Sequence, residues 1–230
     1  MRVVLASHNA GKLAELSALL GPLGWSLTDP GALGIPAPDE VRATFIENAL
    51  DKARHVAAAS GLPALADDSG LVVPALGGAP GIHSARYAGP GASDAENNAR
   101  LLLAIASLDA PAAYYYCALV FVRRPDDPAP VIGVGTWHGR LQKTPSGSGG
   151  FGYDPLFRIP ELQLTAAELP AARKNRTSHR ARAMAELVAG LRQAGDLPRG
   201  PRLRRDSPRR FKLKTTALPS LELLSHPSRV

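Results

Sequence analysis

Apolar and polar residues follow one another in blocks that predict strands alternating with helices. The chain opens with a short apolar run, Val3 to Ala6, followed by a polar turn. Leucines then recur three and four residues apart up to Gly21-Pro22, a period typical of one apolar helix face that ends at a glycine and a proline. The first part of the chain therefore predicts a strand, a loop and a helix.

Patterns further along the chain predict three more helices and a hairpin. A Ser or Thr followed three residues later by Glu is the pattern of a capping box, and aromatic or β-branched runs are typical of strands. Strands and helices mixed in this way predict an α/β fold with a mixed sheet. The expected elements are helices from Thr44 to Gly61, from Ser93 through Leu108 and from Ser178 to Leu191, and antiparallel strands from Tyr114 to Val122 and from Val131 to Leu141.

The composition is that of an ordinary globular protein. The chain has 230 residues, of which 45% are hydrophobic and 20% charged, so it has enough apolar residues for a core of its own. Its single cysteine, Cys117, excludes an internal disulfide framework and favours a reducing compartment. The sequence shows neither a signal-peptide core nor an apolar run that could span a membrane. A cytoplasmic location without a membrane partner is therefore expected.

The net charge of +7 is confined to the end of the chain. Residues 198–230 hold nine Lys or Arg and two acidic residues, whereas residues 1–197 hold 18 of each sign. We therefore expect one domain over residues 1–197 and a basic, Arg- and Pro-rich tail over residues 198–230 that is disordered. No nucleic-acid partner is expected, although such a tail would allow weak, salt-sensitive, non-specific binding.

The polar turn after the first strand suits a phosphate group. Backbone N–H groups at a helix start, together with one lysine, favour anions. The turn is not a Walker A loop, because Ala6 and Leu13 stand where that motif needs Gly and Ser or Thr. The alternative is a plain polar turn with an exposed lysine. The candidate residues are Ser7, His8, Asn9, Ala10, Gly11 and Lys12.

Acidic residues after another apolar run suit a metal ion. Asp67-Asp68-Ser69-Gly70 reads as adjacent acids at a strand end followed by a tight turn, which could hold Mg²⁺ and orient a water molecule. Successive strand residues face opposite sides, so only one carboxylate should point into a given site. Glu40 could reach the same metal from a loop. The alternatives are a solvated turn and a surface Glu40.

Two later stretches suit a base and its polar edge. Glycines around Phe151 and Tyr153 would let the backbone approach a ligand, and an aromatic ring can stack on a base. Lys174, His179 and Arg180 gather cations near a helix start, where the helix dipole disfavours them, which points to an anionic or carbonyl-bearing ligand. The alternatives are a tight connection with core aromatics and a solvated basic face.

Together these stretches resemble one family, the non-canonical purine nucleoside triphosphate pyrophosphatases, also called inosine triphosphatase or Ham1-like proteins. The resemblance spans about residues 1–192. It is carried, in the family's order, by Ser7-His8-Asn9-Ala10-Gly11-Lys12, Phe45-Ile46-Glu47-Asn48-Ala49 with Lys52-Ala53, Ala66-Asp67-Asp68-Ser69-Gly70-Leu71, Gly77-Gly78-Ala79-Pro80-Gly81-Ile82, Ser84-Ala85-Arg86-Tyr87-Ala88-Gly89, Gly149-Gly150-Phe151-Gly152-Tyr153-Asp154-Pro155 and Ser178-His179-Arg180.

The resemblance implies a fold and an activity. The fold would be an elongated mixed β-sheet with flanking helices, in two lobes around a central cleft. The activity would be Mg²⁺-dependent hydrolysis of ITP, dITP and XTP to the monophosphate and pyrophosphate by a homodimer. Such an enzyme removes deaminated purines from the nucleotide pool.

The resemblance also implies a role for each matched residue. Asp68 would be the catalytic base, and Glu40 and Asp68 the metal ligands, with Asp67 as a possible helper. The loop from Ser7 to Lys12 would hold the triphosphate. The remaining substrate-binding residues would be Ser69 beside the substrate, Phe151, Gly152, Tyr153 and Asp154 around the base, and Lys174, His179 and Arg180 at the purine edge.

Two departures and one rival family qualify this picture. Pro170-Ala171-Ala172-Arg173 stands where the family usually carries acids, and residues 198–230 have no counterpart in it. Maf-like pyrophosphatases, which act on modified pyrimidines, are the rival, but the Phe-Gly-Tyr-Asp and Ser-His-Arg stretches argue against them.

Cationic donors such as Lys174 or Arg180 would pair with the 6-carbonyl of hypoxanthine or xanthine, whereas the adenine amino group would be left unpaired, at a cost of roughly 1–3 kcal/mol.

Overall fold

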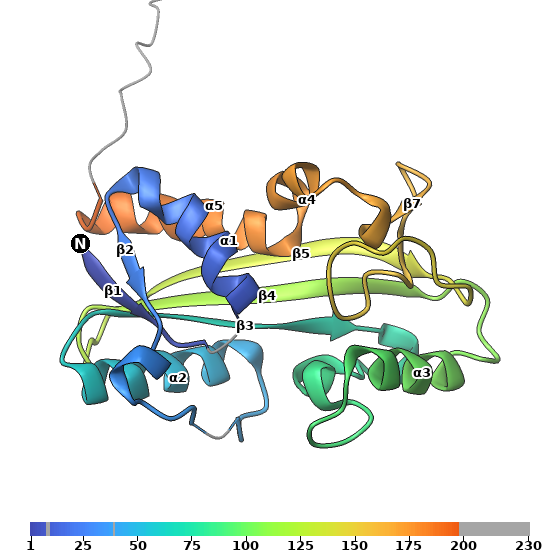
Figure 1. The fold of residues 1–230 in the computed structure, drawn as a ribbon, viewed down its shortest axis with the longest axis horizontal. Helices are drawn as coiled ribbons and strands as arrows, with labels where there is room; N and C mark the ends of the chain where they lie inside the picture. The colour runs from blue at the N-terminus through green and yellow to red at the C-terminus, as the bar shows by residue number, and fades with distance from the viewer. Residues whose placement is uncertain (8–9, 39, 198–230) are drawn as a thin grey trace, which may run out of the picture. The chain divides into compact units, whose positions relative to one another are not determined.

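The structure is a computed structural model that describes residues 1–7, 10–38 and 40–197. These residues form one open mixed sheet with helices on both faces (Figure 1). In the described residues the sheet has seven strands in the order β2-β1-β3-β4-β5-β6-β7. The strands are β1 (Arg2–Leu5), β2 (Ser26–Thr28), β3 (Ala64–Val72), β4 (Ala112–Val122), β5 (Val131–Leu141), β6 (Phe157–Ile159) and β7 (Leu164–Thr165). The expected mixed sheet with flanking helices is confirmed.

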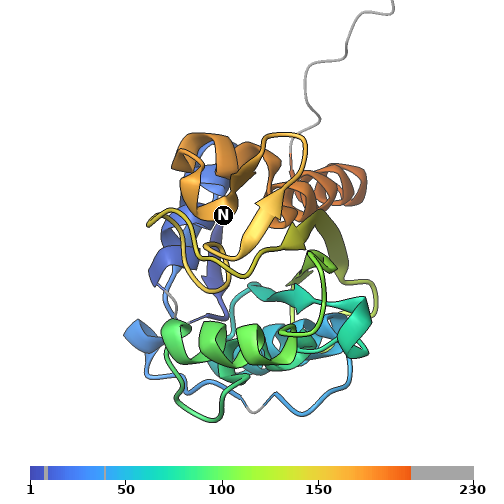
Figure 2. The same cartoon turned by 90° about the vertical axis from the view of Figure 1, so that its right-hand side faces the viewer.

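The helices divide between the two faces of this sheet. They are α1 (Ala10–Leu20), α2 (Phe45–Ser60), α3 (Asp94–Ala104), α4 (Ala171–Thr177) and α5 (His179–Ala194). In Figure 1, α1, α4 and α5 lie above the sheet and α2 and α3 lie below it; Figure 2 shows the same layers from the side. The strands β1, β2 and β3 pair in parallel, and β3 through β7 pair antiparallel.

Alternating side chains of the central strands fill two cores. Cys117, Leu119 and Phe121 of β4 face α1 and α5, whereas Ala118 and Val120 face α2. All of these side chains are buried, because both faces of this part of the sheet are covered. A third core lies toward the other end of the long strands, where α3 and the segment around β6 pack. The long strands β3, β4 and β5 therefore carry side chains from one core to the next.

The helix α5 lies directly on the backbone of β5. A Cβ atom at Gly135 would stand 2.1 Å from the carbonyl oxygen of His179, and one at Gly133 would stand 2.2 Å from that of Ala183. No side chain fits into such a gap, so glycine is required at both positions. This contact fixes the start of α5, where His179 and Arg180 lie.

Several expected elements are confirmed, and the structure corrects two. The capping box at Ser93 is present, and Val131–Leu141 is a strand with the expected bounds. The helix capped by Ser93 ends at Ala104, short of the expected Leu108. Asp67 to Gly70 forms no turn, because β3 runs without a break from Ala64 to Val72.

Gly70 is required by a close approach and not by a turn. A Cβ atom there would stand 2.4 Å from Ser84 Oγ and 2.5 Å from the carbonyl oxygen of Gly81.

The sequence patterns also missed β2, β6, β7 and α4, which are short. None of the described helices is long and apolar enough to cross a membrane. The expected tail, residues 198–230, lies outside the described residues.

We expect Gly135→Ala to destabilise the protein by about 1–3 kcal/mol, the usual cost of overpacking, because the added methyl group must push α5 away from β5. Urea unfolding measures the loss. The matched control is Gly21→Ala, since a Cβ atom at Gly21 meets no atom within 4 Å. Equal stability of the two variants would show that the contact between α5 and β5 has room for a side chain.

Candidate functional site

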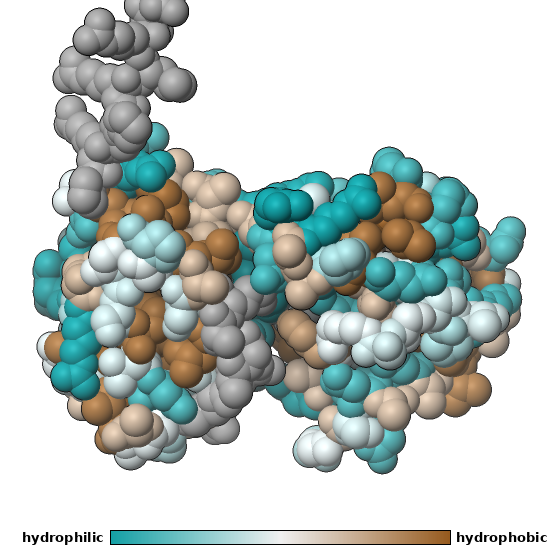
Figure 3. All heavy atoms as spheres, turned by 45° about the horizontal axis from the view of Figure 1, so that its top comes forward, coloured by the Kyte–Doolittle hydropathy of each residue, from teal (hydrophilic) through white to brown (hydrophobic). Residues whose placement is uncertain are grey.

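A cavity of about 770 Å³ lies among the described residues, a size suited to a small-molecule ligand. Its walls come from α1, the loop before α2, β3, the start of α3, the segment around Phe151, and the helices α4 and α5. Figure 3 shows a hollow between two masses of the molecule. The cavity thus brings together side chains that are far apart in the sequence.

Asp67 anchors the α1 and α5 side of the cavity. Its carboxylate pairs with Lys12 of α1 and accepts a hydrogen bond of 2.9 Å from Nε of Arg180. The hydroxyl of Ser69 donates to the same carboxylate at 3.0 Å, and the thiol of Cys117 donates at 3.4 Å. Burial raises the pKa of Asp67, but Arg180 and Lys12 outweigh it and hold the pKa well below its usual range. Asp67 is therefore a fixed buried anion.

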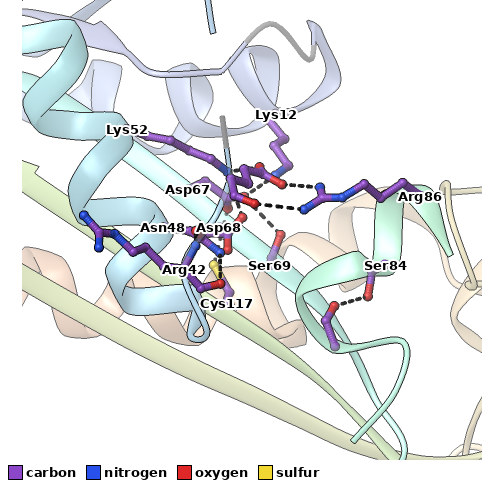
Figure 4. Close-up of polar contacts among 12 residues, drawn as sticks. Lys12, Arg42, Asn48, Lys52, Asp67, Asp68, Ser69, Ser84, Arg86 and Cys117 are labelled. Atoms are coloured by element: carbon purple, nitrogen blue, oxygen red, sulfur yellow. Dashed lines mark hydrogen bonds and ion pairs between the residues drawn. The ribbon is translucent and has the colours of Figure 1, made fainter. Parts of the chain in front are cut away.

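Asp68, the next residue, points to the opposite side of β3. Nζ of Lys52, on α2, contacts Asp68 Oδ1 at 2.8 Å and also pairs with Glu40 (Figure 4). Arg86 donates to Glu40 Oε2 at 2.5 Å and to the Glu40 carbonyl oxygen at 3.3 Å. The other carboxylate oxygen of Asp68, Oδ2, is buried and has no hydrogen-bond partner among the described residues. We call Glu40, Lys52, Asp68 and Arg86 the carboxylate–lysine cluster.

The two carboxylates of this cluster differ in proton affinity. Burial raises the pKa of Asp68 and outweighs the lowering by Lys52, so the pKa ends above its usual value. Burial also raises the pKa of Glu40, but Lys52 and Arg86 together outweigh it and hold the pKa below its usual value. Glu40 therefore stays ionised to lower pH than usual, and Asp68 is the better proton acceptor.

The cavity wall contains Glu40 and Lys52, whereas Asp68 is not among the described lining residues. Lys52, which lines the cavity, contacts Asp68 Oδ1. Sequence reasoning assigned no role to Lys52 or Arg86. Lys52 could have been found as a lone cation on the helix face that buries Ala49, Ala53 and Val56. Arg86 gave no comparable signal, because it ends a short 3-10 helix and contacts Glu40 in a loop 46 residues earlier.

The far end of the cavity holds an exposed aromatic ring. Phe151 is 46% exposed, with the Lys174 ammonium 4.7 Å from its ring centre and the Arg180 guanidinium at 5.7 Å. Asp154 pairs with Lys174 and accepts the backbone N–H of Phe151 at 3.0 Å. The next peptide unit is tied to α3, because Gly152 donates to Asp94 at 2.6 Å and accepts from Asn98 at 2.8 Å. The ring is thus held from two sides.

His179 lines the same cavity as a neutral side chain. It stacks on Tyr115 with ring centres 4.7 Å apart and planes inclined by 13°. Burial and the nearby Arg180 hold the pKa of His179 well below its ordinary value. Its Nδ1 atom is buried and has no hydrogen-bond partner among the described residues. A polar ligand could therefore bind to this atom.

The remaining expected site residues divide into three groups. Ser7, Ser69, Gly152, Tyr153 and Asp154 line the cavity with those already described. The hydroxyl of Tyr153 donates to the Ser84 carbonyl at 2.8 Å. Ala10 and Gly11 form the start of α1. His8 and Asn9 lie outside the described residues.

The structure corrects the expectation that cations near the start of a helix point to an anionic or carbonyl-bearing ligand. Lys174 lies on the separate short helix α4, and it pairs with Asp154. Arg180 at the start of α5 pairs with Asp67. Two of the three expected cations therefore have carboxylate partners inside the protein, and their position near a helix start does not by itself demand an anionic ligand.

The carboxylate–lysine cluster suits a hard metal ion. Mg²⁺ is usually bound by one or two carboxylates together with phosphate oxygens. Glu40 and Asp68 supply such oxygens, and Asp68 Oδ2 is buried without a partner in the described part of the chain. Among the described residues no group of three or more His, Cys, Asp or Glu could hold a metal alone. Oxygens from a ligand would complete the coordination.

The fold and this cavity define an α/β protein with a large charged pocket on an open mixed sheet. The model of the Ham1 family matches residues 3–190, and the chain belongs to that family. Two relatives share the name dITP/XTP pyrophosphatase. The one from Ralstonia nicotianae is 57% identical over 194 residues, 83% of this chain and 96% of the relative. The one from Bordetella pertussis is 54% identical over 201 residues, 86% and 94%.

Solved structures of the family share the fold. The HAM1 protein from Coxiella burnetii has a TM-score of 0.79 at 44% identity and covers 84% of this chain and 99% of its own. The Ham1 protein from Staphylococcus aureus has a TM-score of 0.74 at 33% identity, covering 85% and 100%. The expected family membership is thus confirmed.

We expect Asp67→Asn to destabilise the protein by about 3 kcal/mol or more, because it leaves two inward-facing cations short of a buried carboxylate. Urea unfolding at neutral pH measures the loss. Asp126→Asn is the matched control, since Asp126 is 82% exposed on its side chain and pairs with Arg124 at the surface, where such pairs contribute little. If both variants lose similarly little stability, the buried anchor is not a main support of the fold.

Proposed function

We propose that this protein hydrolyses the non-canonical purine nucleoside triphosphates ITP, dITP and XTP to the monophosphate and pyrophosphate. One observation carries the proposal: a single cavity joins the carboxylate–lysine cluster to the exposed Phe151 ring. Relatives at 54–57% identity that are named dITP/XTP pyrophosphatase support the substrate class. The cellular role is the removal of deaminated purines from the nucleotide pool.

The charges of the cavity give the nucleotide a direction. The triphosphate binds toward the start of α1, Lys12 and the carboxylate–lysine cluster, where backbone N–H groups and cations stabilise negative charge. The loop from Ser7 to Lys12 contributes its backbone and its lysine there. The base stacks on Phe151 at the other end, because an aromatic ring binds the face of any base.

Mg²⁺ is the proposed cofactor, held by Glu40 and Asp68 with phosphate oxygens completing its coordination. When bound, the ion neutralises phosphate charge and orients the attacking water molecule. Ser69 contacts the substrate from β3. Asp67 is already bound to Lys12 and Arg180, and it positions those two cations and takes no place among the metal ligands.

Asp68 is the proposed catalytic base. Its carboxylate accepts a proton from the water molecule as the water oxygen bonds to the α-phosphorus. The bond from the α-phosphorus to its bridging oxygen breaks, and that oxygen leaves with pyrophosphate. The raised pKa of Asp68 suits this role, since a stronger base accepts the proton more readily near neutral pH. Lys12 and Lys52 stabilise the charge that develops on the phosphate oxygens.

Recognition of the base depends on its 6-position. Lys174 and Arg180 present N–H donors near Phe151, and these pair with the 6-carbonyl of hypoxanthine or xanthine. Adenine carries an amino donor there, so its group and the protein's donors would both lack an acceptor. Unpaired buried polar groups cost roughly 1–3 kcal/mol each, which supports rejection of ATP. His179, Tyr153 and Asp154 shape the rest of the base pocket.

The decisive experiment measures pyrophosphate release from ITP, dITP, XTP, ATP, GTP and dTTP, with and without Mg²⁺. We expect fast, Mg²⁺-dependent turnover of the first three, and a loss of about a thousandfold or more in kcat for Asp68→Asn, because the amide cannot accept the proton. Circular dichroism confirms that the variant is folded. Turnover centred on dTTP would place the protein with the pyrimidine enzymes, and full activity of Asp68→Asn would exclude it as the base.

The expected homodimer, cytoplasmic location and domain division complete the proposal. Residues 1–197 carry the catalytic function, and the family model and the curated relatives, which cover 83–86% of this chain, support that division. Residues 198–230 are an accessory segment. The subunits pair without nucleic acid or membrane as partners.

We expect deletion of residues 198–230 to leave kcat and KM within about twofold of the full chain and the free energy of unfolding within a few tenths of a kcal/mol. The reason is that the described core clusters lie within residues 3–197. Steady-state kinetics and urea unfolding measure this. Light scattering of both proteins should give the mass of a dimer. Loss of activity, or of binding to RNA or DNA at low salt, would give the tail a function.

A further inference from the structure

Lys52 stands where a bound cation would contact both carboxylates. Its Nζ contacts Asp68 Oδ1 at 2.8 Å and pairs with Glu40 Oε1, and its side chain is only 12% exposed. It reaches this place from α2, one turn after the buried Asn48. Both oxygens of Glu40 pair with a cation, Oε1 with Lys52 and Oε2 with Arg86, so a metal ion that binds Glu40 together with Asp68 must displace one of these contacts.

The other contacts of Glu40 let it remain in place without Lys52. Arg86 donates to Glu40 Oε2 and to the Glu40 carbonyl oxygen, so the side chain and backbone of Glu40 are both anchored. Movement of Lys52 would release Glu40 Oε1 and Asp68 Oδ1. Together with Asp68 Oδ2, which has no hydrogen-bond partner in the described part of the chain, these oxygens would then be available to a metal ion.

The charge balance opposes a metal ion that arrives alone. The cluster holds two carboxylates and two cations, so it is neutral as it stands. A divalent cation that displaced Lys52 would leave an ammonium group in a poorly solvated position without its two anions. A buried unpaired charge is costly, so Lys52 needs another anion close by. The phosphates of a nucleotide in the same cavity supply one.

We propose that Lys52 is an exchangeable cation that pairs with Glu40 and Asp68 until a divalent metal ion and a triphosphate bind together, and that it then pairs with the phosphates. This exchange rests on the proposed function. It couples metal and nucleotide binding, so that each strengthens the other. It also frees the Asp68 oxygen that Lys52 now contacts. The base is thereby released from its lysine only when a substrate is present.

Binding of Mn²⁺ in the absence of nucleotide tests the exchange, with electron paramagnetic resonance to measure free Mn²⁺. Lys52→Met keeps a side chain of similar length without the charge, and we expect it to bind Mn²⁺ about tenfold or more tightly than the wild type. The matched control is Lys143→Met, which removes an ammonium that donates to the Ala106 carbonyl oxygen and does not line the cavity. Its Mn²⁺ affinity should stay at the wild-type level.

Two more variants locate the effect and guard against misfolding. Lys52→Arg keeps the charge and should bind Mn²⁺ as weakly as the wild type, while Lys52→Met with Glu40→Gln should lose the gain. Equal tightening in Lys52→Met and Lys143→Met would reduce the effect to general electrostatics, and no tightening in a folded Lys52→Met or Lys52→Gln would overturn the exchange. Because these titrations contain no nucleotide, they are independent of whether ITP is the substrate.

Discussion

The buried ion pair between Asp67 and Arg180 is the interaction on which the rest of the site depends. It joins the middle of β3 to the start of α5 across 113 residues of sequence, and Lys12 adds α1 to the same carboxylate. Charges in a protein interior are stable only when they are paired, so these three elements constrain one another's positions. The pair places the start of α5 against the cavity and holds Asp67, whereas its neighbour Asp68 takes no part in it.

Neighbouring aspartates on one strand thereby have opposite properties. Alternation along β3 gives Asp67 one face of the sheet and Asp68 the other. Both are desolvated, which raises the pKa of each, but Asp67 meets the cations of two helices and its pKa ends low, whereas Asp68 shares its lysine with Glu40 and its pKa ends high. The two pKa values differ because Asp67 pairs with two cations, whereas Asp68 pairs with one lysine that also pairs with Glu40.

Sequence patterns predicted the long elements and the residue types of the site. The Ser93 capping box and the strand from Val131 to Leu141 depend on local spacing, and that is why they could be read from the chain. Lys52 and Arg86 were missed because their roles arise from contacts across 12 and 46 residues with Glu40, which no local pattern records. The place of Gly70 in a continuous strand was missed for the same reason, since its neighbours come from the later segment around Gly81 and Ser84.

The seam between α5 and β5 limits how the cavity wall at the start of α5 can change in evolution or by design. With no space for even one methyl group at Gly133 and Gly135, the helix cannot slide or tilt along the sheet to admit a larger or differently shaped ligand. New selectivity must therefore come from replacing the side chains at the start of α5 while its backbone stays fixed. A library that varies those side chains should explore more useful pockets than one that varies the glycines beneath them.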